Sequence, residues 1–284
     1  MNAPEAIRLD VRGLAFDAIA AGPADGPLVL LLHGWPQFAD SWAPVVSGLG
    51  ELGYRAVAPD QRGYSPGARP LDVAAYAIGE LVADIAAFAD ALGAGRFHLV
   101  GHDWGGIAGW AAAAALPERV ASFTSLATPH PTALVRAQAG DPDQRAKTSY
   151  VEFFRLPGGV AEKALLADGA ARLRAVYGGI VAADEVESNV RRLSEPGALT
   201  AVLNWYRAFA FDGSIGAVPV PSLYLWGSKD LALGETAARA TAEFVTGPYR
   251  FEPLEGVSHW IVDEVPGRAL TAVREHLTAY PISK

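Results

Sequence analysis

The 284-residue chain contains no cysteine, and only 19% of its residues are charged. The lack of cysteine excludes disulfide bonds and thiolate metal sites. No segment is rich in lysine and arginine, and the formal net charge is −8, so we expect neither nucleic acid nor a membrane as a partner. No apolar run is long enough to span a membrane, and the N-terminal segment has no apolar signal core. The composition therefore predicts a soluble, cytoplasmic protein.

What the chain does contain is a repeated alternation of strand-like and helix-like segments. The continuous apolar run at 27–32 is typical of a strand that is covered on both faces. The other strand-like runs cover 7–11, 54–59, 97–100, 120–126, 221–226 and 249–254, and the helix-like segments cover 41–52, 76–92, 107–116, 234–245 and 264–280. This alternation predicts an α/β fold with a mostly parallel central sheet and helices on both faces.

The alternation stops between residues 131 and 218. This segment is rich in aromatic residues and has a mostly helical pattern, with Gly/Pro breaks. An insertion between two strands of a parallel sheet is expected at the carboxyl edge of the sheet, above the site. We therefore expect a core formed by 1–130 and 219–284 and a helical lid, or cap, formed by 131–218, inserted before the last two strands.

One tight turn lies at the centre of the predicted site. The run Gly101-His102-Asp103-Trp104-Gly105-Gly106 joins a strand to an Ala-rich helix, which is the layout of a nucleophile elbow. The tip is Asp103, and a free carboxylate is ionised at neutral pH. Such a carboxylate forms a usable ester when it attacks saturated carbon, whereas attack on an acyl carbon gives a high-energy anhydride. Epoxide opening and carbon–halogen cleavage fit this chemistry; a helix cap or a solvated loop aspartate is the structural alternative.

A second turn follows the strand at 27–32. The run His33-Gly34-Trp35-Pro36 is expected to expose backbone N–H groups, and we expect the N–H groups of Trp35 and Trp104 to form an oxyanion hole. The Trp35–Pro36 bond is a candidate cis peptide. His33 is expected to organise the loop, and the alternative interpretation is an ordinary strand-to-helix connection.

Two further residues follow the last two predicted strands. Of the six histidines, only His259 lies in a turn from which it can reach back to the elbow. Asp230 follows the preceding strand and is expected to orient His259 as the general base. The alternative for His259 is a surface histidine with no catalytic role.

With these residues in place, the chain resembles the α/β-hydrolase fold superfamily and, within it, the epoxide hydrolases, over nearly its whole length. The core motifs are shared with haloalkane dehalogenases, but two lid motifs are not. The run Tyr150-Val151-Glu152-Phe153-Phe154-Arg155-Leu156-Pro157-Gly158 and the run Leu203-Asn204-Trp205-Tyr206-Arg207 resemble the epoxide-hydrolase segments that carry the two lid tyrosines. The resemblance implies that Tyr150 and Tyr206 donate to the epoxide oxygen, while packing in the lid core is their structural alternative.

The resemblance implies a full reaction without a cofactor or metal. Asp103 attacks the epoxide, and a hydroxyalkyl ester on Asp103 is hydrolysed by water that His259 activates. The lid aromatics, and the lack of an evident cationic clamp in the sequence, predict a neutral, apolar epoxide as substrate. The residues expected to line the substrate pocket are Pro36, Phe153, Phe154, Trp205 and Trp260. The partners expected are this small molecule and water, with a homodimer left open.

Three other functions compete with this interpretation. A haloalkane or haloacid dehalogenase would use the same Asp-His-Asp machinery, and Trp104 matches the halide-binding Trp of the first family. Arginines that would grip a haloacid are absent just after Asp103, where Trp104 and Ile107 stand. A catalytically silent ligand-binding protein would not need an oriented histidine, and a serine esterase is disfavoured because the elbow carries no serine.

Overall fold

In the part of the chain that the computed structural model describes, residues 3–210 and 213–282, eight strands form one sheet in the order β1-β2-β4-β3-β5-β6-β7-β8. The strand β2 runs antiparallel to its neighbours β1 and β4, and all other neighbours are parallel. The strands are β1 (Glu5–Val11), β2 (Leu14–Ala21), β3 (Leu28–Leu32), β4 (Arg55–Pro59), β5 (Phe97–His102), β6 (Val120–Leu126), β7 (Ser222–Gly227) and β8 (Tyr249–Leu254).

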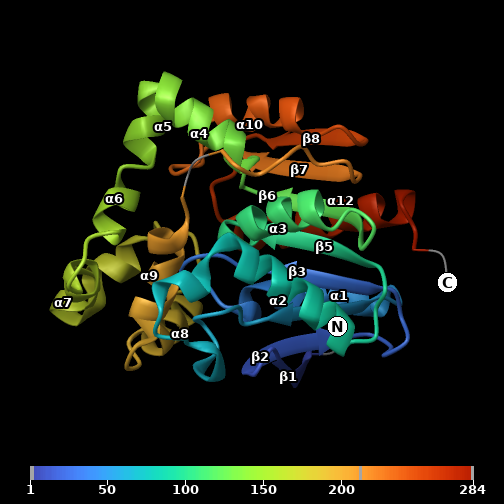
Figure 1. Ribbon diagram of the computed structural model, residues 1–284, viewed down its shortest axis with the longest axis horizontal. Coiled ribbons are helices and arrows are strands. Elements are labelled where there is room, and N and C mark those ends of the chain that lie inside the picture. The colour runs from blue at the N-terminus through green and yellow to red at the C-terminus, as the bar shows by residue number, and fades with distance from the viewer. Residues whose placement is uncertain (1–2, 211–212, 283–284) are drawn as a thin grey trace.

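Helices cover both faces of the sheet, as the alternation predicts (Figure 1). Val29 and Leu31 of β3 pack with the helices α1 and α12, whereas Leu30 and Leu32 pack with α2 and α3 on the opposite face. Burial of each such side chain contributes roughly 1.5–3 kcal/mol, so a strand between two helical layers is apolar at every position. The core helices are η1 (Ala39–Trp42), α1 (Ala43–Glu51), η2 (Pro66–Ala68), η3 (Val73–Tyr76), α2 (Ile78–Ala91), α3 (Trp104–Ala115), α10 (Glu235–Ala240), η4 (Thr241–Phe244), α11 (Ile261–Glu264) and α12 (Pro266–Ala279).

Six helices lie between β6 and β7, where the lid is predicted. They are α4 (Pro131–Gly140), α5 (Pro142–Lys147), α6 (Tyr150–Phe154), α7 (Val160–Ala175), α8 (Ala183–Leu193) and α9 (Ala198–Ala208), counted over the described residues of this segment, which leave out 211–212. Figure 1 shows α6 to α9 gathered at one end of the sheet, whereas α4 lies beside α10 of the core. Leu134 and Ala137 of α4 form a small apolar cluster with Leu233 and Ala237. The predicted boundaries of the lid, 131 and 218, stay a prediction.

Polar contacts fasten the lid to the core. Arg192 of α8 forms an ion pair with the buried Asp60 at the end of β4, and its guanidinium lies 3.6 Å above the ring of Phe38. The indole nitrogen of Trp205 in α9 donates to the backbone oxygen of Arg62 at 2.8 Å. Because these bonds join segments far apart in the sequence, they fix how the lid sits over the site.

The predicted elements agree with the structure except at a few places. The strand β2 was not predicted, although Phe16 and Ala18 point into the core in alternation with Asp17. The helix expected over 264–280 is α12, which begins two residues later at Pro266, and the short helix α11 precedes it. Within the described residues, no helix combines the length and the apolar character that crossing a membrane requires.

Candidate active site

Asp103 lies at the turn between β5 and α3, with φ 51° and ψ −119°, a backbone conformation that residues other than glycine rarely adopt. Such strain persists only where the surrounding structure imposes it. The glycines around the turn permit the close packing that does so. A Cβ on Gly105 would overlap the backbone oxygen of Leu32, and a Cβ on Gly34 would overlap the side chain of Asp103 itself. The turn therefore has the geometry of the predicted elbow.

Two backbone N–H groups hold the Asp103 carboxyl group. The N–H of Trp35 donates to Oδ1 at 2.7 Å, and the N–H of Trp104 also hydrogen-bonds the carboxyl group. The Trp35–Pro36 bond, a candidate cis peptide in the sequence, is cis. Burial raises the pKa of Asp103, while His259 and the two N–H groups act to lower it. The N–H groups predicted for an oxyanion hole thus converge on the carboxyl group of Asp103.

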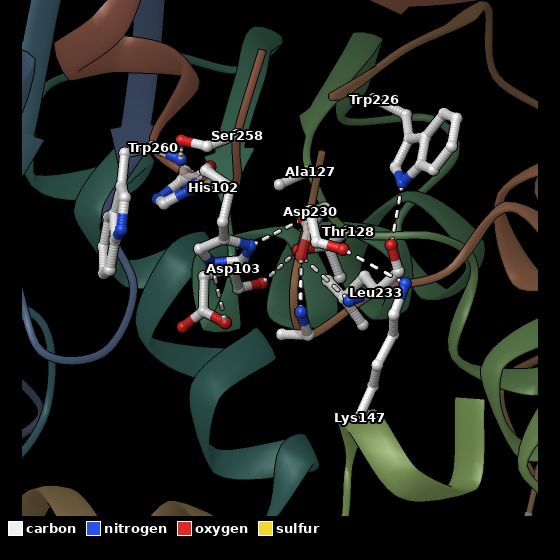
Figure 2. A network of polar contacts seen from close by, with 12 residues as sticks. His102, Asp103, Ala127, Thr128, Lys147, Trp226, Asp230, Leu233, Ser258 and Trp260 are labelled. Carbon is white, nitrogen blue, oxygen red and sulfur yellow. Dashed lines mark hydrogen bonds and ion pairs between the residues drawn. The ribbon is translucent and has the colours of Figure 1, made fainter. Parts of the chain in front are cut away.

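Figure 2 shows Asp103 and Asp230, the two acids of the site, and His259 lies between them. Its Nδ1 lies 2.8 Å from Oδ2 of Asp230, and its Nε2 lies 3.7 Å from Oδ2 of Asp103. The side chain of Asp230 is fully buried, and its Oδ1 accepts the N–H groups of Ala232 at 2.7 Å and Leu233 at 2.9 Å. Three donors therefore hold Asp230, and Asp230 fixes the orientation of the imidazole.

The two acids also set the charge of His259. Burial lowers the pKa of His259, but the charge and hydrogen bond of Asp230 and the charge of Asp103 outweigh burial and raise the pKa to about 9. The imidazole is therefore charged at neutral pH as long as Asp103 is an anion. Removal of the charge on Asp103 would therefore lower the pKa of His259.

The two lid tyrosines lie next to each other above the elbow, but they are not equivalent. Tyr150 lines the cavity, whereas Tyr206 is only 2% exposed and packs edge-on against the ring of Trp104 at 4.9 Å. The side chain of Trp104 hydrogen-bonds Tyr206, and Tyr206 hydrogen-bonds Tyr150. Burial raises the pKa of both phenols, so both keep their protons at neutral pH. The chain of bonds ends at Tyr150, which faces the cavity.

The cavity above Asp103 has a volume of about 750 Å³. Of the residues expected to line it, Phe154 and Trp260 do so, together with Trp35. The other three, Pro36, Phe153 and Trp205, are not part of the lining. Trp205 is buried between the lid and Arg62, and the backbone oxygen of Pro36 accepts a hydrogen bond from Tyr177 at 2.8 Å.

Sequence reasoning missed two cations on the cavity wall. Lys147, at the end of α5, and Lys229, beside Asp230, both line the cavity. The sequence shows no evident cationic clamp, and the structure places these two lysines on the cavity lining. The adjacency of Lys229 to Asp230 was a signal that could have been used. Lys147 carried none, because only the docking of α5 brings it to the site.

The remaining histidines near the site have structural partners. Nε2 of His33 accepts the N–H of Gln61 at 3.1 Å, and burial lowers the pKa of His33 to about 3. Nε2 of His102 donates to the backbone oxygen of His259 at 2.9 Å, and burial likewise lowers the pKa of His102 to about 3. Both rings are neutral at physiological pH. His33 links the loops that follow β3 and β4, and His102 links the end of β5 to the loop that follows β8. Across 3–210 and 213–282, no group of three or more His, Asp or Glu residues is suited to a metal ion.

Comparisons with known proteins bear on this geometry. A family model described as alpha/beta hydrolase fold matches residues 27–266. The chain is 33% identical to epoxide hydrolase A of Mycobacterium tuberculosis over 98% of both chains. It is 32% identical to the AB hydrolase superfamily protein YfhM of Bacillus subtilis, over 95% of this chain and 96% of the relative. The crystal structure of epoxide hydrolase A from Mycobacterium thermoresistibile superposes with a TM-score of 0.86 at 29% identity, covering 99% of this chain and all of the other.

Proposed function

We infer the reaction of this chain from one premise: it belongs to the α/β hydrolase fold family and, within it, to the epoxide hydrolases. It is a hydrolase that adds water to a small-molecule epoxide and releases a vicinal diol. The roles of individual residues are our proposal. The observation that supports them most is the convergence of the Trp35 and Trp104 N–H groups and of His259 on the carboxyl group of Asp103.

Ring opening is the first half of the proposed mechanism. The N–H of Trp35 holds Oδ1 of Asp103, the N–H of Trp104 also bonds the carboxyl group, and Oδ2, which faces His259, attacks one epoxide carbon. The C–O bond of the ring breaks, an ester C–O bond forms on Asp103, and the ring oxygen takes the proton of Tyr150. Tyr206 donates to Tyr150 and so stabilises the phenolate that is left. Ring strain supplies the rest of the driving force.

Ester hydrolysis is the second half. Once Asp103 is esterified, its negative charge no longer lies 3.7 Å from His259. Loss of an anion at this distance lowers the pKa of His259 by roughly 1–3, which frees Nε2 to remove a proton from water. The resulting hydroxide attacks the ester carbonyl carbon, and the Trp35 and Trp104 N–H groups stabilise the oxyanion. The bond between the carbonyl carbon and the ester oxygen breaks, the departing alkoxide takes the proton from His259, and the diol leaves. The Asp103 carboxyl group, which now carries the water oxygen, loses its proton, and Tyr150 regains one through the solvent.

The contacts of Trp104 favour this proposal over a dehalogenase. A departing halide needs an N–H donor, and the Trp104 indole has a single one. That side chain is engaged with Tyr206, which is in turn bonded to Tyr150. A silent ligand-binding protein has no use for a buried Asp230 that is held by three donors and aimed at His259.

A matched pair of assays tests the proposed function. Purified protein is incubated with styrene oxide, with detection of the diol, and with a bromoalkane, with detection of bromide. We expect diol without bromide, and we expect Asp103→Asn to abolish the diol. Bromide without diol would reverse the assignment and make Trp104 the leaving-group site. A cytoplasmic location and a homodimer stay predictions, which cell fractionation and sedimentation test.

A further inference from the structure

The lining of the cavity combines cationic and apolar side chains. Lys147 and Lys229 contribute ammonium groups, and Val176 and Ile180, from the segment after α7, contribute apolar surface. Leu231, which is 81% exposed, adds an apolar side chain beside the lysines. The chain as a whole has a net charge of −8, so a cavity lined by two lysines differs in charge from the rest of the molecule. The arrangement suits a ligand with an apolar body and a negative charge.

Lys147 has donor capacity that the fold does not use. Its side chain is 24% exposed, and Nζ donates to the backbone oxygen of Asp230 at 3.2 Å. The other contact is an ion pair with Asp143 at 3.2 Å, but the Asp143 side chain is 68% exposed. An exposed pair of this kind contributes only about 0.3–0.5 kcal/mol. An ammonium group has three donors, so one donor of Lys147 remains for a ligand in the cavity.

The two carboxylates on the cavity lining do not account for the lysines. Asp103 is held by the N–H groups of Trp35 and Trp104 and faces His259, and Asp230 is held by two N–H groups and the same histidine. Lys229 is exposed, and the part of the chain that the structure describes offers its side chain no ion pair. The charge of Lys229 is therefore available at the rim of the cavity.

The position of Lys147 relates this charge to the reaction. Lys147 ends α5, and Tyr150 begins α6 only three residues later, so one short stretch of the lid brings both the ring-oxygen donor and the cation to the cavity. A cavity of about 750 Å³ is much larger than the epoxide ring and leaves room for a chain that carries a second group. An anion on that chain can reach Lys147 while the ring lies between Asp103 and Tyr150.

We propose that Lys147, assisted by Lys229, binds a carboxylate on the substrate, so that the preferred substrates are epoxides with an apolar chain and a carboxylate remote from the ring. This proposal rests on the proposed function for the epoxide end of the substrate, and it adds the carboxylate that is recognised at the other end. It differs from the expectation of a neutral, apolar epoxide. Lys147 is a specificity-determining residue that contributes to substrate binding and leaves the chemical steps to Asp103, His259 and the tyrosines.

A binding measurement that needs no turnover tests the proposal. Calorimetry compares phenylbutanoate with phenylbutanamide, which share a body and differ in charge. We expect the carboxylate to bind the wild type roughly 5–50-fold more tightly, with the ratio falling as salt is added. The ratio should fall to about one in Lys147→Met and be largely kept in Lys147→Arg. Lys163→Met, which removes an exposed lysine of α7 outside the cavity, is the matched control and should keep the full ratio.

A kinetic comparison extends the test to the reaction. A short series of terminal epoxy acids is assayed against the methyl ester of each, and the acid preference of the wild type should appear mainly in KM and vanish in Lys147→Met. Equal binding of carboxylate and amide by the wild type overturns the proposal, as does a ratio that survives in Lys147→Met. A preserved carboxylate preference in a protein that opens no epoxide would contradict the proposed function and leave the carboxylate site standing.

Discussion

Replacement of Asp230 by Asn should separate the two halves of the reaction. The carboxylate of Asp230 accepts on both oxygens, from His259 on Oδ2 and from the N–H groups of Ala232 and Leu233 on Oδ1. An amide has only one acceptor oxygen. If that oxygen keeps the two backbone N–H groups, the amide NH₂ faces Nδ1 of His259 and moves the ring proton to Nε2. The nitrogen that faces the ester is then protonated and cannot act as a base.

The expected size of the effect follows from the step that needs this base. Loss of the orienting acid in a related triad, through the wrong tautomer, lowers the rate roughly 10⁴-fold. We therefore expect ester hydrolysis in Asp230→Asn to be slower by roughly 10³–10⁴-fold. Ring opening uses Asp103 and Tyr150, which keep their contacts, so it should change by no more than about tenfold. The ester on Asp103 should accumulate.

Rapid quenching and intact-protein mass spectrometry measure this directly. Asp230→Asn mixed with styrene oxide should show a fast increase in mass by one substrate, followed by slow release of diol. Asp263→Asn is the matched control, because Asp263 also raises the pKa of His259 by its charge but is bonded to Gln37 rather than to the histidine. That variant should accumulate little ester. A slow Asp230→Asn enzyme with no mass increase would refute the assignment of His259 to hydrolysis.

The remaining predictions concern the tyrosines, the lid and pH. Tyr150→Phe should slow ester formation by roughly 10²–10³-fold in single-turnover experiments. Tyr206→Phe should slow it by only about tenfold, because Tyr206 acts through Tyr150. A larger effect of Tyr206→Phe than of Tyr150→Phe would contradict the proposal that Tyr150 is the direct donor. His259→Gln should trap the ester as a stable mass increase, and a variant that turns over without an adduct would exclude the covalent route. Arg192→Met should lower the free energy of unfolding by roughly 1–3 kcal/mol in urea titrations, because it leaves the buried carboxylate of Asp60 without its partner. The pKa of His259 rises on folding from 6.5 to about 9, so protonation of His259 contributes about 3 kcal/mol to the free energy of unfolding below pH 6.5, and this contribution is lost as the pH rises through 9. The difference in stability between wild type and His259→Gln should therefore decrease as the pH rises. A difference that grows toward high pH would refute the predicted direction of the pKa shift.

Local sequence was enough for most of the sheet and for the turns that carry the reaction. The apolar run of β3 and the turn at Asp103 can each be interpreted without knowing their neighbours, because burial on both faces and the positive φ of Asp103 impose strong local demands. The chain order of Asp103, Asp230 and His259 at the ends of parallel strands also implied that they meet at one edge. The sequence did not reveal the strand β2, because its small alanines give only a weak alternation of apolar and polar residues.

The tertiary structure alone decided how the lid divides its aromatics and where its cations lie. Tyr150 and Tyr206 look alike in sequence, yet the docking of α9 against Trp104 buries one and leaves the other on the cavity. Trp205 turns toward Arg62 instead of the substrate, and the end of α5 carries Lys147 to the backbone of Asp230. Hydrophobic periodicity is a property of single elements and predicts which face of a helix is buried. It cannot predict which neighbour that face meets, because that depends on contacts between segments far apart in the chain.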